Sequence, residues 1–208
     1  MTNAQARKAH WEQVWTTKAA DKVSWFQDHP ELSLAMIAKL ELRRGAGIID
    51  VGGGCSALAG HLAMLGHSNV AVLDIAEAAL AKAHHELGGL GDDVTWICAD
   101  LLEWNPPPGL FELWHDRAVF HFLTTDAERR LYAQILAAAL APGGHAIIAT
   151  FAPDGPQSCS GLAVQRHDGA SLQAALGDDF ILEREITEDH LTPGGVVQKF
   201  VWCQFRRR

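Results

Sequence analysis

The chain alternates short apolar runs with longer stretches in which apolar and polar residues follow helical spacing. The apolar runs predict strands at residues 47–51, 70–74, 94–98, 111–115 and 145–151. The longer stretches predict helices at residues 4–18, 31–43, 55–65, 76–87 and 126–140. Because these strands lack strict alternation and helices separate them, the pattern favours a parallel sheet covered by helices on both faces.

The C-terminal part has a different pattern. Residues 180–190 and 196–205 alternate more regularly, and a Thr-Pro-Gly-Gly turn at 192–195 lies between them. This pattern predicts a β-hairpin, so the sheet is expected to finish with an antiparallel strand. Together, these features predict one α/β domain over residues 1–208, built on a seven-stranded, mostly parallel sheet.

Composition narrows the classes of partner. The chain has 208 residues, of which 48% are hydrophobic, and its 17 basic and 25 acidic residues give a net charge of −8. A negative chain repels phosphate groups and anionic lipid, so neither nucleic acid nor a membrane is an expected partner. The arginines at 206–208 are interpreted as a solvated basic end.

The cysteines and the N-terminal residues bear on location. Cys55, Cys98, Cys159 and Cys203 lie far apart without a Cys-x-x-Cys pair, so neither a disulfide framework nor a metal site is expected. No apolar run approaches the ~20 residues that a membrane helix needs. Residues 1–10 lack the apolar stretch of a secretion signal, so the expected location is cytoplasmic.

A glycine-rich segment follows the first strand. Gly52, Gly53 and Gly54 lie between that strand and the next helix, where glycine lets a ligand approach the backbone closely. The spacing Gly52-x-Gly54-x-x-Ala57 also fits the dinucleotide-binding fingerprint, so by itself it does not identify the ligand.

Acidic residues close three successive strands of the predicted sheet. Asp50 and Asp74 end the first two strands, and Asp100 follows the third. The carboxyl ends of parallel strands meet in one crevice, so these carboxylates are expected to face the same ligand. Asp74 would accept the ribose hydroxyls and Asp100 would lie near an adenine amino group. A ligand with an amine and a positive sulfonium suits such a site better than a pyrophosphate does.

On these residues the chain resembles a class I S-adenosylmethionine-dependent methyltransferase over most of its length. The resemblance implies a Rossmann-like sheet and S-adenosyl-L-methionine as the cofactor. One departure is Ser56, which stands where the family often has a third glycine. The resemblance assigns these residues to the cofactor site: Trp11, Trp15, Trp25, Asp50, Gly52, Gly54, Ser56, Asp74, Ile75, Asp100, Leu101, Asp116 and Arg117.

Three segments of the chain point to a subgroup within this family. Segments 10–15, 23–27 and 113–118 are similar to thiopurine methyltransferase-like and small METTL-type enzymes. That similarity implies that Arg117 contacts the cofactor and that residues 1–30 form an aromatic lid. Three of the seven tryptophans lie in the first 25 residues, and Trp11 and Trp15 share one face of a helix. An aromatic face beside a cation contributes about 0.5–2 kcal/mol.

Methyl transfer from a sulfonium is an in-line displacement, so the protein mainly aligns the nucleophile and excludes water. His115, Asp116 and His121 follow the fourth strand and are candidate general bases, although none is assigned as catalytic. Residues 152–169 are expected to form an acceptor-side loop, in which Cys159 and His167 are candidate contacts for a soft acceptor. On this hypothesis, Cys159→Ser should abolish turnover and leave cofactor affinity intact.

Other functions remain as alternatives. A nicotinamide oxidoreductase of the single-domain type needs a Tyr-x-x-x-Lys pair, but Tyr132 is followed by Leu136. A noncatalytic S-adenosylmethionine-binding module and a protein-lysine methyltransferase also fit the fold. A small-molecule acceptor with a thiol, amine or metalloid nucleophile is favoured, because the chain is short and acidic and lacks an added recognition domain.

Overall fold

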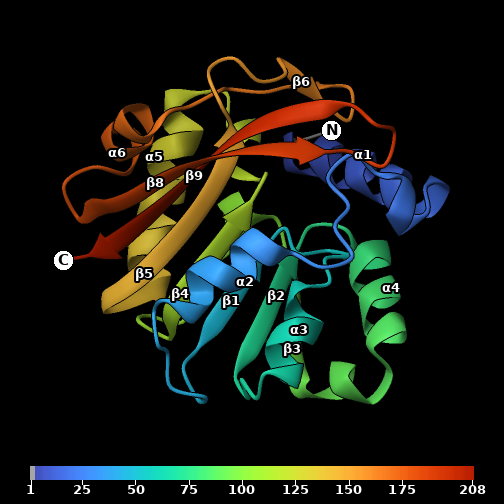
Figure 1. Cartoon of the computed structure of the whole chain (residues 1–208), viewed down its shortest axis with the longest axis horizontal. Coiled ribbons are helices and arrows are strands. Elements are labelled where there is room, and N and C mark those ends of the chain that lie inside the picture. Colours follow the sequence, from blue (N-terminus) through green and yellow to red (C-terminus); the bar gives the residue numbers. More distant parts are fainter. Residues whose placement is uncertain (1–2) are drawn as a thin grey trace.

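In the computed structural model, which describes residues 3–208, the long strands form one sheet. Its strands are β1 (Ile48–Val51), β2 (Val70–Asp74), β3 (Val94–Cys98), β4 (Phe111–Arg117), β5 (Leu140–Phe151), β8 (Phe180–Leu191) and β9 (Val197–Arg207). The order across the sheet is β3-β2-β1-β4-β5-β9-β8 (Figure 1). The first five strands in this order, β3, β2, β1, β4 and β5, are parallel to one another. Strand β9 lies antiparallel to both β5 and β8. The predicted seven-stranded α/β fold is therefore confirmed.

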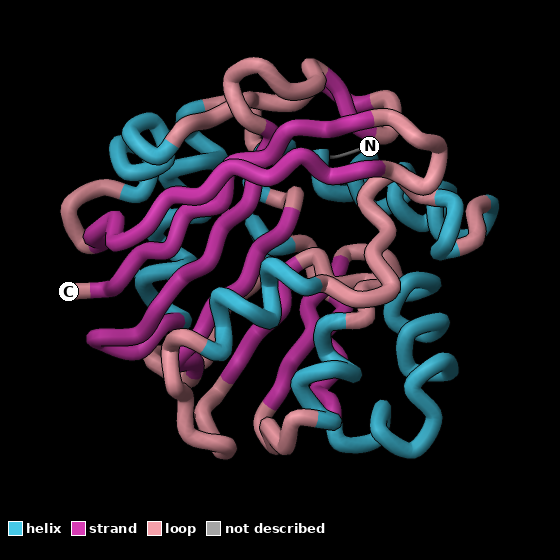
Figure 2. The backbone as a smooth tube through the Cα atoms, viewed as in Figure 1, coloured by secondary structure: helices cyan, strands magenta, loops and turns pink. Residues whose placement is uncertain are grey.

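Helices pack on both faces of this sheet (Figure 2). They are α1 (Asn3–Thr17), α2 (Glu31–Ala38), α3 (Leu58–Met64), α4 (Glu77–Leu87), α5 (Asp126–Ala139) and α6 (Gly169–Leu176), with 3-10 turns η1 (Ala20–Lys22), η2 (Gly88–Asp93), η3 (Leu101–Glu103) and η4 (Phe120–Phe122). Helices α2 and α3 cover one face, and α5 and α6 cover the other. Within residues 3–208, none of the helices combines the length and the apolar character that crossing a bilayer requires.

The core forms two layers because successive strand residues point to opposite faces. In β1, Ile49 packs in the layer under α5 and α6, whereas Ile48 packs in the layer under α2 and α3. Helix α5 is amphipathic and begins with a capping box between Thr125 and Glu128. The alternation fixes which face each side chain at a strand end occupies, including those at the functional site.

Several predicted boundaries differ from the structure. The helix expected at 31–43 ends at Ala38, and Glu41 then turns the chain with a φ of 49°. The helix expected from residue 55 begins only at Leu58, because the glycine loop occupies the residues before it. Strand β4 continues two residues further than expected. Strand β5 starts at Leu140, where the pairing register shifts around the Pro-Gly-Gly segment.

The segment 152–169 is shorter as a loop than the sequence predicts. It contains a small hairpin of β6 (Ser158–Cys159) and β7 (Leu162–Ala163), and helix α6 begins at its end. Helix α6 was not predicted, although Asp168 and Ser171 form a capping box that marks its start. The hairpin and the adjoining loops lie along the upper edge of the sheet in Figure 2.

Helix α1 lies near the carboxyl ends of the parallel strands (Figure 1). It packs against α4, and the segment after it crosses toward the tip of the β8–β9 hairpin. There, the backbone oxygen of Ser24 lies 2.8 Å from His190 Nε2. The N-terminal segment therefore covers the edge of the sheet where the predicted ligand-binding residues gather.

Candidate active site

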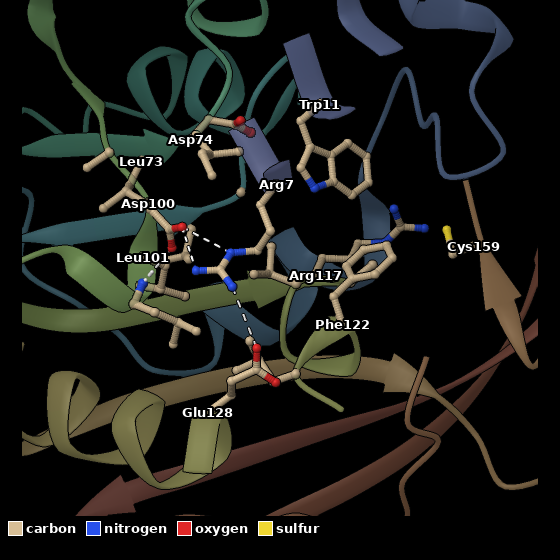
Figure 3. Close-up of a pocket in the computed structure, with 18 of the residues that line it drawn as sticks. Arg7, Trp11, Leu73, Asp74, Asp100, Leu101, Arg117, Phe122, Glu128 and Cys159 are labelled. Carbon is tan, nitrogen blue, oxygen red and sulfur yellow. Dashed lines mark hydrogen bonds and ion pairs between the residues drawn. The ribbon is translucent and has the colours of Figure 1, made fainter. Parts of the chain in front are cut away.

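Two adjoining cavities lie at the carboxyl ends of β1, β2 and β4, beneath α1. The larger cavity extends from Asp100 and Glu128 at one end to Cys159 at the other (Figure 3). The smaller cavity lies between the glycine loop and α2. Both cavities share walls formed by Trp15, Trp25, Gly52 and Arg117, so they belong to one site.

The glycine loop requires glycine for steric reasons. Gly52 and Gly54 have φ values of +65° and +39°, in a region that side chains disfavour. A Cβ at Gly52 would lie 2.0 Å from a methyl carbon of Val119, and one at Gly54 would lie 2.8 Å from Asp74 Oδ2. Gly52 lines both cavities, whereas Gly54 lines neither and lies against Asp74 and Trp15.

Asp74 ends β2 and faces the larger cavity, as predicted, with Ile75 beside it. The backbone N–H of Ala76 donates a 2.8 Å hydrogen bond to Asp74 Oδ1. Burial raises the pKa of Asp74 to about 7, which the hydrogen bond from Ala76 only partly offsets. Near neutral pH this carboxyl group is therefore divided between its protonated and ionised forms.

Asp100 also faces the larger cavity, and Leu101 lies next to it. Its Oδ1 accepts a 3.0 Å hydrogen bond from the Leu102 backbone N–H. Its Oδ2 accepts hydrogen bonds from Arg7 Nε at 3.0 Å and Arg7 Nη2 at 2.7 Å. Arg7 Nη1 lies 3.6 Å from Glu128 Oε1, so this arginine of α1 bridges two acidic residues (Figure 3).

Further polar contacts hold α1 over the site. The Glu12 carboxylate accepts hydrogen bonds from the backbone N–H groups of Glu77 at 2.7 Å and Ala78 at 3.2 Å, at the start of α4. Lys82 of α4 donates to backbone oxygens of Trp15 and Lys18 at the other end of α1. These contacts satisfy free groups at helix ends.

The sequence did not point to Arg7, Glu12 or Lys82 as site residues. Each pairs with a residue more than sixty positions away, since the hydrogen bonds of Arg7 to Asp100 span 93 positions and those of Lys82 span 64 and 67. Their positions on predicted helices are ordinary for charged residues. The one available sign of a site lay in the helix predicted at residues 4–18. This helix carries a charged residue every few positions together with two tryptophans.

Aromatic side chains form the roof of the larger cavity, and Trp11, Trp15 and Trp25 are among them. Trp11 makes edge-to-face contacts with Trp25 at 6.0 Å and with Phe122 at 5.1 Å between ring centroids. Trp15 contacts Trp25 in the same way at 5.9 Å. Phe122, which belongs to η4, was not among the predicted site residues. This cluster lines the cavity with aromatic rings, whose faces can stabilise a cation.

The smaller cavity contains two polar groups with unsatisfied atoms. Asp50 Oδ1 lies 2.7 Å from His115 Nδ1, whereas Asp50 Oδ2 is buried and has no hydrogen-bond partner within residues 3–208. Arg117 Nη1 donates a 2.7 Å hydrogen bond to the backbone oxygen of Trp25. Arg117 Nε and Nη2 are buried without a hydrogen-bond partner in the same described range, and the guanidinium lies 5.2 Å from the centroid of the Phe200 ring. Ser56 also lines this cavity, and its hydroxyl oxygen accepts from the Leu58 N–H at 3.1 Å.

Asp116 requires a correction, because it lines neither cavity and points into the core. Its Oδ1 accepts hydrogen bonds from the backbone N–H groups of Val119 at 2.9 Å and Phe120 at 3.3 Å. Its Oδ2 accepts a 2.8 Å hydrogen bond from the Tyr132 hydroxyl. Burial raises the pKa of Asp116 to about 6. The hydrogen bonds from Val119 and Phe120 hold its carboxyl group against the segment after β4.

The candidate bases do not present a free basic atom to the larger cavity. Both ring nitrogens of His115 are engaged, by Asp50 and by Ser33. His121 is fully buried outside both cavities, and burial lowers its pKa to about 3. With Asp116 directed inward, none of the three side chains is placed to take a proton from an acceptor.

The two acceptor-loop residues are placed differently. Cys159 lines the larger cavity, and burial raises the pKa of its thiol to about 11, so the thiol stays protonated near neutral pH. His167 lies outside both cavities, with its ring 5.2 Å from that of Phe120, and burial lowers its pKa to about 4. In the described part of the chain, no group of three or more His, Cys, Asp or Glu side chains fits a metal ion.

Comparison with known proteins places this geometry in a recognised class. Residues 48–144, just under half of the chain, match a family model described as a methyltransferase domain. The matched segment runs from β1 into β5 and supplies the glycine loop, Asp74, Asp100 and Arg117. The part of the chain that forms the floor of the site is therefore similar to a methyltransferase domain. No curated protein matches the chain.

Solved structures share the fold over nearly the whole chain. A protein from work on the conversion of a disulfide bond into a thioacetal group during echinomycin biosynthesis is similar with a TM-score of 0.79 at 21% identity, covering 97% of this chain and 92% of the other. An S-adenosylmethionine-dependent methyltransferase from Anabaena variabilis gives 0.77 at 15% identity, covering 100% and 96%. The 1,6-didemethyltoxoflavin-N1-methyltransferase of Burkholderia thailandensis gives 0.70 at 19% identity, covering 100% and 91%. At these identities the likeness establishes the Rossmann-like methyltransferase fold.

Proposed function

We propose that this protein transfers a methyl group from S-adenosylmethionine to a small-molecule nucleophile. The observation that carries the proposal is that one joined pair of cavities holds carboxylates on both sides of the glycine loop. Asp74 and Asp100 lie in the larger cavity, and the unpartnered oxygen of Asp50 lies in the smaller one. The Burkholderia neighbour, whose structure holds 1,6-didemethyltoxoflavin and S-adenosylhomocysteine, supports a small-molecule acceptor.

The residues present fit each part of the donor. Asp100 and Leu101 suit the adenine, and Asp74 with Ile75 suits the ribose. In the smaller cavity, the free oxygen of Asp50 suits an ammonium group. The unpartnered nitrogens of Arg117 suit a carboxylate, so the two orphaned groups match the two charges of an amino acid. When bound, S-adenosylmethionine supplies an electrophilic methyl group on a positively charged sulfur.

The N-terminal segment contributes by excluding water and fixing position. Trp11 and Trp25 cover the larger cavity, while Arg7 and Glu12 tie α1 to the body of the protein. Holding two reactants in line contributes ~7–11 kcal/mol toward a displacement of this kind. Residues 1–30 therefore act as a lid over the donor, with residues 1–2 lying outside the described part of the chain. Residues 152–169 form the boundary of the site on the acceptor side.

The acceptor end of the larger cavity favours a nucleophile that needs no protein base. Trp11, Phe122 and Cys159 line this end, and the candidate bases face elsewhere. A thiol has an ordinary pKa of about 8.5 and is therefore partly ionised at neutral pH. A lysine ammonium has an ordinary pKa of about 10.4 and must first lose its proton. We therefore place thiols and metalloids before amines as acceptors. The protonated Cys159 thiol serves as a soft contact to such an acceptor.

The decisive experiment incubates the full-length protein with S-adenosylmethionine labelled in its methyl group and a panel of small thiols, amines and metalloid oxyanions. We expect label to appear in at least one small molecule and to require active protein. Label found only on lysines of a protein extract would contradict the small-molecule assignment. S-adenosylhomocysteine binding without transfer to any acceptor would instead indicate a binding module.

A further inference from the structure

Three buried side chains form a hydrogen-bonded series beside the smaller cavity. His115 Nδ1 lies 2.7 Å from Asp50 Oδ1, and His115 Nε2 lies 3.0 Å from Ser33 Oγ. The exposed fractions of Ser33, His115 and Asp50 are 1%, 2% and 2%. They come from α2, β4 and β1, and Asp50 is the register partner of His115 in the sheet. All three line the smaller cavity.

We propose that Ser33 and His115 are positioning residues that hold the Asp50 carboxylate with one oxygen turned toward the ammonium group of the methyl donor. The proposal rests on the proposed function, because it needs a donor that carries an amino-acid end. Neither Ser33 nor His115 is assigned a contact with the reacting atoms.

With Asp50 ionised and His115 neutral, the donor and acceptor inventory of the three groups sets where the protons lie. An ionised carboxylate only accepts hydrogen bonds, so His115 Nδ1–H donates to Asp50. In a neutral ring, the other nitrogen is then an acceptor, and the Ser33 hydroxyl donates to it. The serine thereby selects the tautomer of His115 that the aspartate requires.

The consequence for Asp50 is a division of labour between its two oxygens. Oδ1 is held by His115, while Oδ2 is buried and has no hydrogen-bond partner among the described residues. Oδ2 also lies against the glycine loop, because a Cβ on Gly53 would come within 2.6 Å of it. A buried carboxylate oxygen without a partner is costly, and a bound cation would offset that cost.

The position of Ser33 connects this series to the lid. Ser33 lies in the first turn of α2, directly after the segment that carries Trp25, Gln27 and Pro30 along the same cavity. A helix fixes Ser33 more firmly than a loop would, so the Asp50 carboxylate has a rigid support on the side opposite the glycine loop. The first turn of α2 therefore belongs to the site.

The test compares two ligands that differ only in what the proposal concerns. S-adenosylhomocysteine carries the ammonium and carboxylate, whereas 5′-methylthioadenosine has the same adenine and ribose without the amino-acid end. Dissociation constants of both would be measured for the wild type, Ser33→Ala, Ser33→Thr and the control Ser68→Ala. Ser68 is an exposed serine away from both cavities.

Ser33→Ala is expected to weaken S-adenosylhomocysteine by about tenfold and methylthioadenosine by less than about twofold, the size of one charge-coupled hydrogen bond. Ser33→Thr, which keeps the hydroxyl, should restore most of the loss, and Ser68→Ala should change neither constant. Equal weakening of both ligands, or of neither, would overturn the positioning role and leave the proposed function standing. A wild type that binds neither ligand would overturn both proposals.

A measurement on the wild type covers the case in which Ser33→Ala does not fold. Long-range proton–nitrogen spectra of the protein bound to S-adenosylhomocysteine report the tautomer of His115. We expect a neutral ring with its proton on Nδ1. A neutral ring protonated on Nε2 would overturn the arrangement, because it could not donate to Asp50.

Discussion

The carboxylates of Asp50 and Asp116 lie on neighbouring strands, at the same end of the sheet, and both are buried. They differ in what their oxygens contact. Asp116 has both oxygens occupied, by two backbone N–H groups and the Tyr132 hydroxyl. Asp50 has one oxygen held by His115 and the other unpartnered beside a cavity in the described structure. One aspartate stabilises the fold, and the other is left available to a ligand.

The difference follows from strand periodicity. Asp50 pairs with His115, so Asp116, one residue further along β4, points to the opposite face of the sheet. That face is covered by α5, which supplies Tyr132, whereas the face of Asp50 is covered by α2, which supplies Ser33. A shift of one position thus exchanges a ligand-facing carboxylate for a structural one.

The largest expected effect is on stability, through Asp116→Ala. The change leaves the Tyr132 hydroxyl and two backbone N–H groups without their acceptor. We expect the free energy of unfolding to fall by about 3–4 kcal/mol, since each buried group left unsatisfied costs about 1–3 kcal/mol. Urea denaturation followed by circular dichroism would measure it. A loss below about 0.5 kcal/mol, the range of neutral surface changes, would contradict the structural role of Asp116.

Asp50→Asn should reverse the pattern, with a large effect on binding and a small one on stability. The amide removes the charge that faces the smaller cavity. We expect S-adenosylhomocysteine affinity to fall about 30-fold, because hydrogen bonds to charged groups contribute about 1.5–3 kcal/mol. Calorimetric titration of the variant, with the wild type beside it, would measure the change. Unchanged affinity would show that the free oxygen of Asp50 has no part in binding.

Asp74 is expected to make the affinity for the methyl donor depend on pH. Its pKa is raised to about 7, so the ionised form dominates only above that pH. On the proposed function, this ionised form is the one that accepts the two ribose hydroxyls. Donor affinity should therefore rise about tenfold between roughly pH 6 and pH 8, following the ionised fraction. Stability of the free protein runs the opposite way, because a raised pKa gives stability that is lost as pH rises through about 7.

Titrations of S-adenosylhomocysteine at several pH values would measure this dependence. Asp74→Asn is the control, and it should bind more weakly with little pH dependence over the same range. If affinity in the wild type instead increased toward pH 6, the assignment of Asp74 to the ribose would fail.

A smaller effect is expected from Arg7→Gln, which loosens the lid without touching either buried aspartate. Arg7 bridges Asp100 and Glu128, and its side chain is 30% exposed, so solvent screens the pair. We expect S-adenosylhomocysteine to dissociate about fivefold faster, equivalent to about 1 kcal/mol. Lys8→Gln makes the same charge change on an exposed neighbour in α1 and should leave the rate unaltered. Equal rates for both variants would separate Arg7 from lid closure.

The smallest effect concerns Cys159→Ser. The complete loss of turnover expected from the sequence is revised, because burial keeps this thiol protonated and so excludes it as a thiolate near neutral pH. A role as an acceptor contact predicts that the acceptor KM rises about threefold, within the range of a single sulfur contact. Donor affinity should not change, and Cys98→Ser, at an exposed position, is the matched control. A loss of turnover without a change in KM would point to a different role.

Much of the site was predictable because it depends on local sequence. Apolar runs located the strands, and Asp74 and Asp100 could be placed because Asp74 ends β2 and Asp100 lies two residues after β3. The glycine loop could be placed for the same reason. Arg7 was not predictable, since its partner Asp100 lies 93 positions away and Arg7 is an ordinary charged residue in its own helix.

Asp116 shows a different limit. Its place near the carboxyl end of the fourth strand was predicted, but its direction depends on the register between β1 and β4, which the sequence leaves open. Ser33 could not be assigned for a similar reason, because its partner His115 lies 82 positions away on another element. The sequence shows which polar residue lies at the end of a strand. The face of the sheet to which its side chain points is known only from the assembled sheet.

The most direct test of the central claim is calorimetric titration of S-adenosylhomocysteine into the full-length wild type at about pH 8, where Asp74 is ionised. The account predicts saturable binding with one ligand per chain, weakened in Asp50→Asn and retained in the folded fraction of Asp116→Ala. Absence of binding heat from protein that is folded by circular dichroism would contradict it.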